Sequence, residues 1–188
     1  MCEERADVIG GDVKDVLYSS AFERATEHRL PFETDGSENE LMLKLSDGSF
    51  IPVTGNQTGV LMLDYLIGAM RRAGKLPEHP YFLKTIVTTE MARKVAEANG
   101  VTCCDTFTGF KFMAEKMNEL ESAGKNTVIF SYEESYGYMI GHYVRDKDAV
   151  TASLLLTEMA AWYHAQGMTL FDLSLIHISE PTRQAEIS

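Results

Sequence analysis

The feature that most constrains the fold is a regular alternation of helical and strand patterns from residue 54 to about residue 172. Apolar residues at helical spacing, with capping residues or glycines at their ends, predict helices at 60–73, 90–99, 110–123 and 148–166. Short apolar or β-branched runs predict strands at 84–88, 101–104 and 127–131. Strands that alternate with helices indicate a layered α/β/α domain with a largely parallel or mixed sheet. A ligand is expected beyond the carboxyl ends of its strands.

The composition is that of a globular protein, with 45% hydrophobic and 24% charged residues in a chain of 188. Its net charge of −11 repels polyanions, so nucleic acid is not an expected partner. No apolar run reaches membrane-spanning length, and acidic residues stand where a signal peptide needs basic ones. The neighbouring Cys103 and Cys104 are poorly placed for a bridge. We therefore expect a cytoplasmic protein with no membrane partner.

The most informative loop follows the strand predicted at 127–131 and contains Glu133, Glu134 and Ser135. Carboxylates accept hydrogen bonds from vicinal sugar hydroxyls and serine can donate or accept, so the loop suits the recognition of a hexose. An exposed acidic turn without function would have the same residues. A glycoside hydrolase that uses both glutamates is disfavoured, because neighbours on one loop do not reach the opposed placement, roughly 5 Å or wider, that this chemistry requires.

Two other turns have functional and purely structural interpretations. Arg145 and Lys147 precede the helix predicted at 148–166, whose first N–H groups are available to an anion, although their charges could simply pair within a solvated turn. Thr108 either caps the helix that follows or contacts a ligand, and Gly109 permits close backbone approach. The segment Thr-Gly-Asn-Gln-Thr-Gly at 54–59 lacks the ending of a P-loop and predicts a helix start.

Three segments together resemble a known family in order and spacing: 54–66, 106–112 (Thr-Phe-Thr-Gly-Phe-Lys-Phe) and 132–149, which begins Tyr-Glu-Glu-Ser-Tyr-Gly-Tyr. They are similar to the α-D-phosphohexomutases, which comprise phosphoglucomutases and phosphomannomutases. The likeness covers about residues 34–172 and is greatest to bacterial phosphoglucomutases. It implies a four-domain parent that uses a phosphoserine and Mg²⁺ to interconvert glucose 1-phosphate and glucose 6-phosphate through a hexose bisphosphate. A phosphomannomutase and a non-catalytic sugar-phosphate-binding module are the alternatives.

The resemblance also implies roles for individual residues. Glu133 and Ser135 match the residues that read sugar hydroxyls, while Glu134 is expected to be structural. Thr108 and Gly109 match a loop that faces the sugar. Lys147 matches a basic residue of the active cleft, and Arg145 is a weaker match. The implied substrate-binding set is Glu133, Ser135, Thr108, Gly109, Lys147 and Arg145.

The chain also departs from the family. No Thr-Ala-Ser-His-Asn-Pro-like stretch occurs, so we expect no catalytic residue, no domains 1 and 4, and no activity of this chain alone. In the segment that matches the metal loop, only Asp35 remains as a carboxylate in register, so weak Mg²⁺ binding is expected. Residues 1–53 are expected to be a partial, divergent domain 2 that includes a hairpin around Asp47-Gly48, and 54–172 domain 3. Residues 173–188 resemble a translated sequencing adapter.

Overall fold

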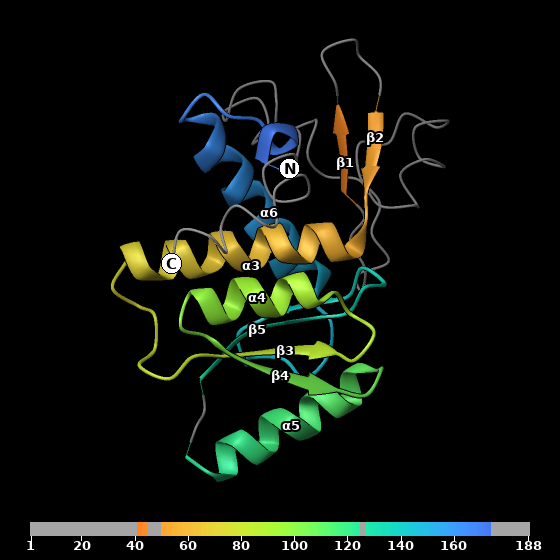
Figure 1. The fold of residues 1–188 in the computed structure, drawn as a ribbon, viewed down its shortest axis with the longest axis vertical. Helices are drawn as coiled ribbons and strands as arrows, with labels where there is room; N and C mark the ends of the chain where they lie inside the picture. Colours follow the sequence, from red (N-terminus) through yellow and green to blue (C-terminus); the bar gives the residue numbers. More distant parts are fainter. Residues whose placement is uncertain (1–40, 45–49, 125–126, 174–188) are drawn as a thin grey trace.

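The structure is a computed structural model that describes residues 41–44, 50–124 and 127–173 (Figure 1). The strands in this part are β1 (Leu41–Lys44), β2 (Phe50–Val53), β3 (Tyr81–Thr85), β4 (Thr102–Thr106), β5 (Val128–Tyr132) and β6 (Tyr138–Ile140). The helices are α3 (Gly55–Arg72), α4 (Glu90–Ala98), α5 (Phe110–Ser122) and α6 (Ala149–His164). None of the described helices combines the length and the apolar character needed to cross a membrane.

The main sheet has the strand order β4-β3-β5-β6. The central strand β3 pairs in parallel with both β4 and β5, whereas β6 runs antiparallel to β5. The sheet is therefore mixed, and the predicted α/β fold class is confirmed. Because β3, β4 and β5 are parallel, the loops that follow them lie at one edge of the sheet. A separate antiparallel pair, β1 and β2, confirms the predicted hairpin, whose turn lies outside the described residues.

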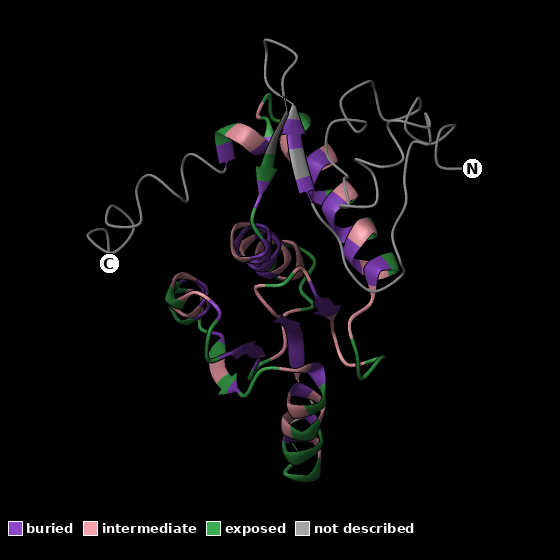
Figure 2. Cartoon of the chain, turned by 90° about the vertical axis from the view of Figure 1, so that its right-hand side faces the viewer, coloured by how far each residue is buried: buried purple, intermediate pink, exposed green. Residues whose placement is uncertain are grey.

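Helices cover both faces of the main sheet: α3, α4 and α6 lie on one side and α5 on the other (Figure 1). Successive residues of a strand point to opposite faces, so Phe82 packs in the core under α3 while Leu83 packs against α5. Strands β3 and β5 are buried between these layers, whereas the outer strand β4 is partly exposed. Exposed residues follow the outer faces of the helices (Figure 2). The smaller core, on the α5 side, consists of Leu83, Phe110, Met113, Met117, Leu120, Val128 and Met139.

The first turn of α3 packs very closely on β5 and on the loop after it. Thr54 caps this helix in a capping box with Gln57, which confirms the helix start predicted for this segment. A Cβ atom at Gly55 would lie 2.1 Å from the carbonyl oxygen of Glu134. One at Gly59 would lie 2.3 Å from the ring of Tyr132. Glycine is thus required on this face for the approach of backbone and ring.

The strand boundaries differ from those predicted. The strand expected at 84–88 is β3 at Tyr81–Thr85. After Thr85 the chain turns, and the amide of Thr88 donates to the carbonyl of Thr85 at 3.1 Å, so the β-branched residues extend beyond the strand into the turn. The three-residue strand β6 was not predicted, because it is too short for a periodic pattern and forms by pairing with β5.

We predict that Gly59→Ala destabilises the protein by about 1–3 kcal/mol, because its methyl group overlaps the ring of Tyr132. Gly68→Ala in the same helix is the matched control. Its added methyl group meets the end of the long Arg72 side chain, at 3.1 Å, and no backbone or ring atom, so it should be neutral or stabilising by up to about 1 kcal/mol. Urea unfolding of the two variants measures the difference, and equal midpoints would contradict the packing described for α3.

Candidate functional site

Two loops at the carboxyl edge of the sheet are joined by the side chain of Glu133. Its carboxylate oxygen Oε1 accepts a hydrogen bond from the backbone N–H of Gly109, 24 residues earlier, at 2.5 Å. The amide of Glu133 donates to the carbonyl of Gly137 at 2.9 Å and closes the β5–β6 turn. The structure therefore brings Glu133 and Gly109 together. Two residues that are expected to face the same sugar must lie close to each other in this way. The second carboxylate oxygen of Glu133 has no hydrogen bond to the described residues.

The turn before α5 differs in one respect from the sequence expectation. The N-cap of α5 is Gly109, without a side-chain cap, so Thr108 does not cap this helix. Gly109 has φ of 111°, a conformation that favours glycine. The exposed Thr108 stands next to the amide that binds Glu133. Its hydroxyl is thus at the surface, where it can meet a ligand.

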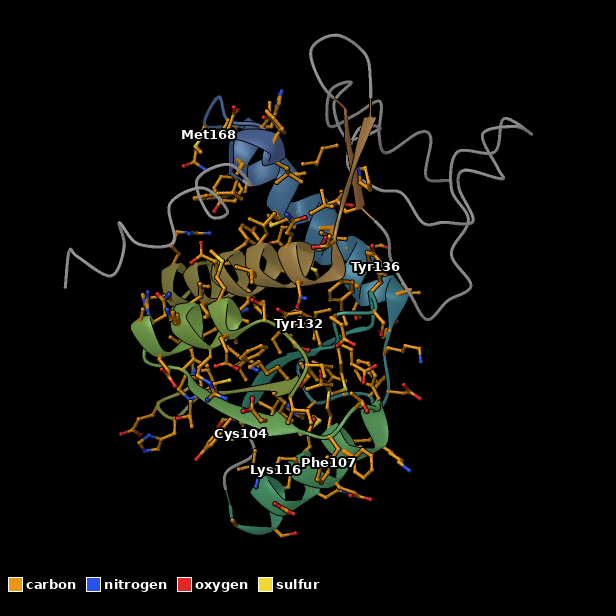
Figure 3. The ribbon with its side chains drawn as sticks, turned by 45° about the vertical axis from the view of Figure 1, so that its right-hand side comes forward. Cys104, Phe107, Lys116, Tyr132, Tyr136 and Met168 are labelled. Carbon is orange, nitrogen blue, oxygen red and sulfur yellow. The ribbon has the colours of Figure 1, made fainter. Side chains whose placement is uncertain are left out.

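The tip of the β5–β6 loop presents Ser135 to solvent. Tyr136 follows with φ of 67°, in the left-handed region, which costs about 1–2 kcal/mol for a residue with a side chain. Tyr136 lies beside the first turn of α3 (Figure 3), where its amide would be 2.9 Å from a Cβ at Gly55. The loop is thus held in an uncommon conformation by α3, and Ser135 is at its exposed point.

The two candidate cations have different surroundings. A Cβ at Gly137 would lie 3.3 Å from Cδ of Lys147, so this lysine packs against the β5–β6 loop. Its ammonium lies 5.8 Å from the ring centroid of Phe110, at the start of α5. Arg145 instead pairs at 2.5 Å with Glu121, at the opposite end of α5 and roughly 15 Å or more along the helix. The structure brings Lys147, and not Arg145, to the loop of Glu133.

A buried lysine that the sequence interpretation missed supports this edge of the sheet. Lys84, at the end of β3, is fully buried. Its ammonium lies 2.8 Å from Glu90 Oε1 and 3.1 Å from Asp105 Oδ1. It also donates to the carbonyl of Thr88 at 3.0 Å. The signal in the sequence was a lysine directly after the apolar residues 81–83 of the strand, a position where a buried charge must find partners.

The electrostatics of this cluster follow from its contacts. Burial by itself lowers the pKa of the Lys84 ammonium, but hydrogen bonds to Glu90 and Asp105 outweigh it and leave that pKa raised. Hydrogen bonds from Lys84 and Arg93 lower the pKa of the Glu90 carboxyl. Arg93 also pairs with Asp105, so both carboxylates are shared between two cations. Lys84 and Glu90 therefore both stay charged near neutral pH.

The described residues do not fit a magnesium site. They contain no group of three or more histidine, cysteine, aspartate or glutamate side chains arranged to hold a metal. A hard dication such as Mg²⁺ prefers several oxygen ligands, including carboxylates. Asp35, the predicted ligand, lies outside the described residues.

Comparison with known proteins decides the family. A family model described as phosphoglucomutase/phosphomannomutase, alpha/beta/alpha domain III, matches residues 54–177. The chain belongs to the phosphoglucomutase/phosphomannomutase family. The resemblance to α-D-phosphohexomutases inferred from three motifs is thereby confirmed, and the layered fold is that of its domain III.

Individual members of the family give the extent of the likeness. The phosphoglucomutase of Staphylococcus aureus is 34% identical over 145 residues, which cover 76% of this chain and 25% of the relative. The "Probable phosphoribomutase" of Schizosaccharomyces pombe is 28% identical over 159 residues, 85% of this chain and 27% of the relative. This chain thus spans about a quarter of the length of these curated relatives.

A solved structure shows the same fold at lower identity. It is the N-acetylphosphoglucosamine mutase of Aspergillus fumigatus in complex with GlcNAc-6P and magnesium. It matches with a TM-score of 0.54 and 12% identity, over 78% of this chain and 34% of the mutase. At this identity the match supports the shared fold of the phosphohexomutase domain.

We predict that Lys84→Met destabilises the protein by about 1–3 kcal/mol at neutral pH, because buried carbonyls lose their donor. It should also flatten the acid dependence of stability. The pKa of Glu90 is lowered in the folded state, so its contribution is present above its usual pKa of 4.5 and is lost as pH falls through the lowered value.

Urea unfolding of both proteins between about pH 7 and 3 measures this effect. Lys116→Met, which removes a surface lysine paired with Glu119, is the control and should keep a wild-type acid slope. Parallel curves for Lys84→Met and the wild-type protein would show that Lys84 does not set the acid dependence.

Proposed function

We propose that this chain is the sugar-recognition part of a phosphoglucomutase that interconverts glucose 1-phosphate and glucose 6-phosphate through a phosphoserine of the parent enzyme. The observation that carries the proposal is the hydrogen bond between Glu133 and Gly109, which joins two of the family motifs into one surface. Sequence identity of 34% to a phosphoglucomutase supports the choice of reaction. The chain alone, which lacks a match to the phosphoserine loop, is proposed to be inactive.

In the proposed complex, each residue has a task that its position allows. Glu133 is held by Gly109 through one oxygen, so the other can accept hydrogen bonds from sugar hydroxyls. The exposed Ser135 and Thr108 can donate to or accept from the same ring. The half-buried Lys147 supplies a positive charge beside the loop, suited to the phosphate of a hexose phosphate or hexose bisphosphate.

Arg145 is also a proposed substrate-binding residue. To bind substrate, its guanidinium must first leave Glu121, with which it forms an ion pair in this structure. Such a pair between partly exposed side chains is worth at most about 1 kcal/mol, so a phosphate can compete for it. Mg²⁺ is proposed only for the parent enzyme, where it stabilises the charge of the transferred phosphate.

Which sugar the parent enzyme acts on is a separate part of the proposal. The relatives described above are named for different sugars, glucose, ribose and N-acetylglucosamine, so family membership does not choose among them. A phosphomannomutase is the nearest alternative. A binding module without catalysis is the other, favoured by a metal loop in which only Asp35 remains as a carboxylate in register.

The domain division and the cellular location are also proposals. We propose that 54–172 is domain 3, 1–53 a partial domain 2, and 173–188 an adapter-derived tail, most of which lies outside the described residues. Domains 1 and 4 of the parent would complete the active cleft. A cytoplasmic location fits two free thiols, of which Cys103 is kept protonated because burial raises its pKa to about 12.

Titration of the 188-residue chain with glucose 6-phosphate, followed by calorimetry, tests the proposal. We expect binding that Glu133→Ala and Ser135→Ala each weaken about tenfold or more, because each removes a hydrogen bond to the sugar. Glu119→Ala, which removes an exposed acid paired with Lys116 at the surface, should bind as the wild-type protein does. Mannose 6-phosphate and ribose 5-phosphate, titrated in parallel, rank the sugars. Absence of binding by all three would contradict the proposed function.

A further inference from the structure

The carboxylate of Glu134 makes contacts unlike those of its neighbours in the loop. Its oxygen Oε2 lies 3.2 Å from the hydroxyl of Thr85 and 3.4 Å from the hydroxyl of Thr88. Both threonines are buried, and their hydroxyls lie 2.7 Å from each other. An ionised carboxylate only accepts hydrogen bonds and each hydroxyl has one proton, so one threonine donates to the other and the second donates to Glu134. Glu134 is thus anchored on the turn after β3, about 50 residues earlier in the chain.

The backbone of the two threonines is itself held by the buried Lys84. The ammonium of Lys84 donates to the carbonyls of Thr85 at 3.3 Å and Thr88 at 3.0 Å. The same ammonium is held by Glu90 and Asp105, at 2.8 and 3.1 Å. A buried charge with all its donors engaged has little freedom to move. The turn that carries both hydroxyls is therefore a rigid support for Glu134.

The backbone of Glu134 is confined from the opposite side by α3. A Cβ at Gly55 would lie 2.1 Å from its carbonyl oxygen, so helix and loop backbones are in direct contact. Tyr136, two residues later, has φ of 67°, which is sparsely populated for a residue with a side chain. Such a conformation persists only where the surroundings over-determine it. Glu134 supplies the side-chain anchor in those surroundings.

We propose that Glu134 is a positioning residue: anchored on Thr85 and Thr88, it orients the loop so that Glu133 meets Gly109 and Ser135 faces solvent. Glu134 does not contact the sugar phosphate in this arrangement. Glu134 affects binding through Glu133 and Ser135. Its expected effect on affinity therefore rests on the proposed function, whereas its expected effect on the geometry of the loop does not. Thr85 and Thr88 share the task through their hydroxyls.

Hydrogen exchange at the Gly109 amide tests the positioning without any ligand. In the 188-residue chain, Glu134→Ala should speed exchange at this amide about tenfold or more, because Glu133 no longer stays against it. Glu134→Gln keeps an acceptor oxygen and should stay within about threefold of the wild-type rate. Glu158→Ala is the matched control: it removes another carboxylate that accepts from a hydroxyl, that of Tyr65 at 2.9 Å, away from the loop.

Titration with glucose 6-phosphate adds the functional readout. Glu134→Ala should weaken binding about tenfold, Glu134→Gln should restore it, and Glu158→Ala should leave it unchanged while lowering thermal stability. A purely structural role of Glu134 would instead change stability and spare both the Gly109 amide and the affinity. Unchanged exchange at Gly109 in Glu134→Ala would overturn the proposal.

If Glu134→Ala unfolds, so that the amides of β3 lose protection as well, a second variant tests the proposal. Thr88→Val removes one hydroxyl and keeps the shape of the side chain, so it should reproduce fast exchange at Gly109 with β3 intact. A wild-type rate at Gly109 in that variant would overturn the proposal. If the wild-type chain binds no glucose 6-phosphate, the proposed function fails, and the exchange rates at Gly109 still decide whether Glu134 positions the loop.

Discussion

The contact between the first turn of α3 and the β5–β6 loop is the constraint on which the rest of the site depends. Gly55 and Gly59 are one helical turn apart, and neither position has room for a Cβ against Glu134 and Tyr132. Because protein interiors are close-packed, this contact fixes the distance between helix and loop with little tolerance. The loop can then hold Tyr136 in the left-handed region and present Ser135 to solvent. A family motif that predicts only a helix start thus also sets the shape of the neighbouring loop.

Electrostatics fix the other side of the same loop. The turn after β3 is organised around the buried ammonium of Lys84, whose charge is matched by Glu90 and Asp105 from the next two elements of the chain. A buried charge is tolerated only where it is paired and hydrogen-bonded, so these elements must pack in one arrangement. The hydroxyls of Thr85 and Thr88 then face Glu134. Packing on one side and a charge cluster on the other hold the loop between them.

Family membership and site geometry answer different questions about this chain. The match of residues 54–177 to domain III establishes the family and the layered fold. The chain spans only about a quarter of the length of its curated relatives, so family membership does not by itself assign their reactions to this chain. The described residues do provide a surface where Glu133 accepts from the amide of Gly109, while Ser135 is exposed on the same loop and Lys147 packs against Gly137. Recognition of a sugar phosphate is the task that we propose for this surface.

The sequence by itself determined the periodic elements and their caps, because these depend on residues about two to four positions apart. The order of the motifs is read directly along the chain. Thr54 and Asp148 cap helices as their positions predict. Only the tertiary structure decided which distant groups meet: Glu133 with Gly109, Glu134 with Thr85, and Arg145 with Glu121 instead of the loop. Such pairs are set by how sheet and helices pack, and no local pattern encodes them. The same holds for β6 and for the partners of Lys84, which exist only once β5 and β3 are in place.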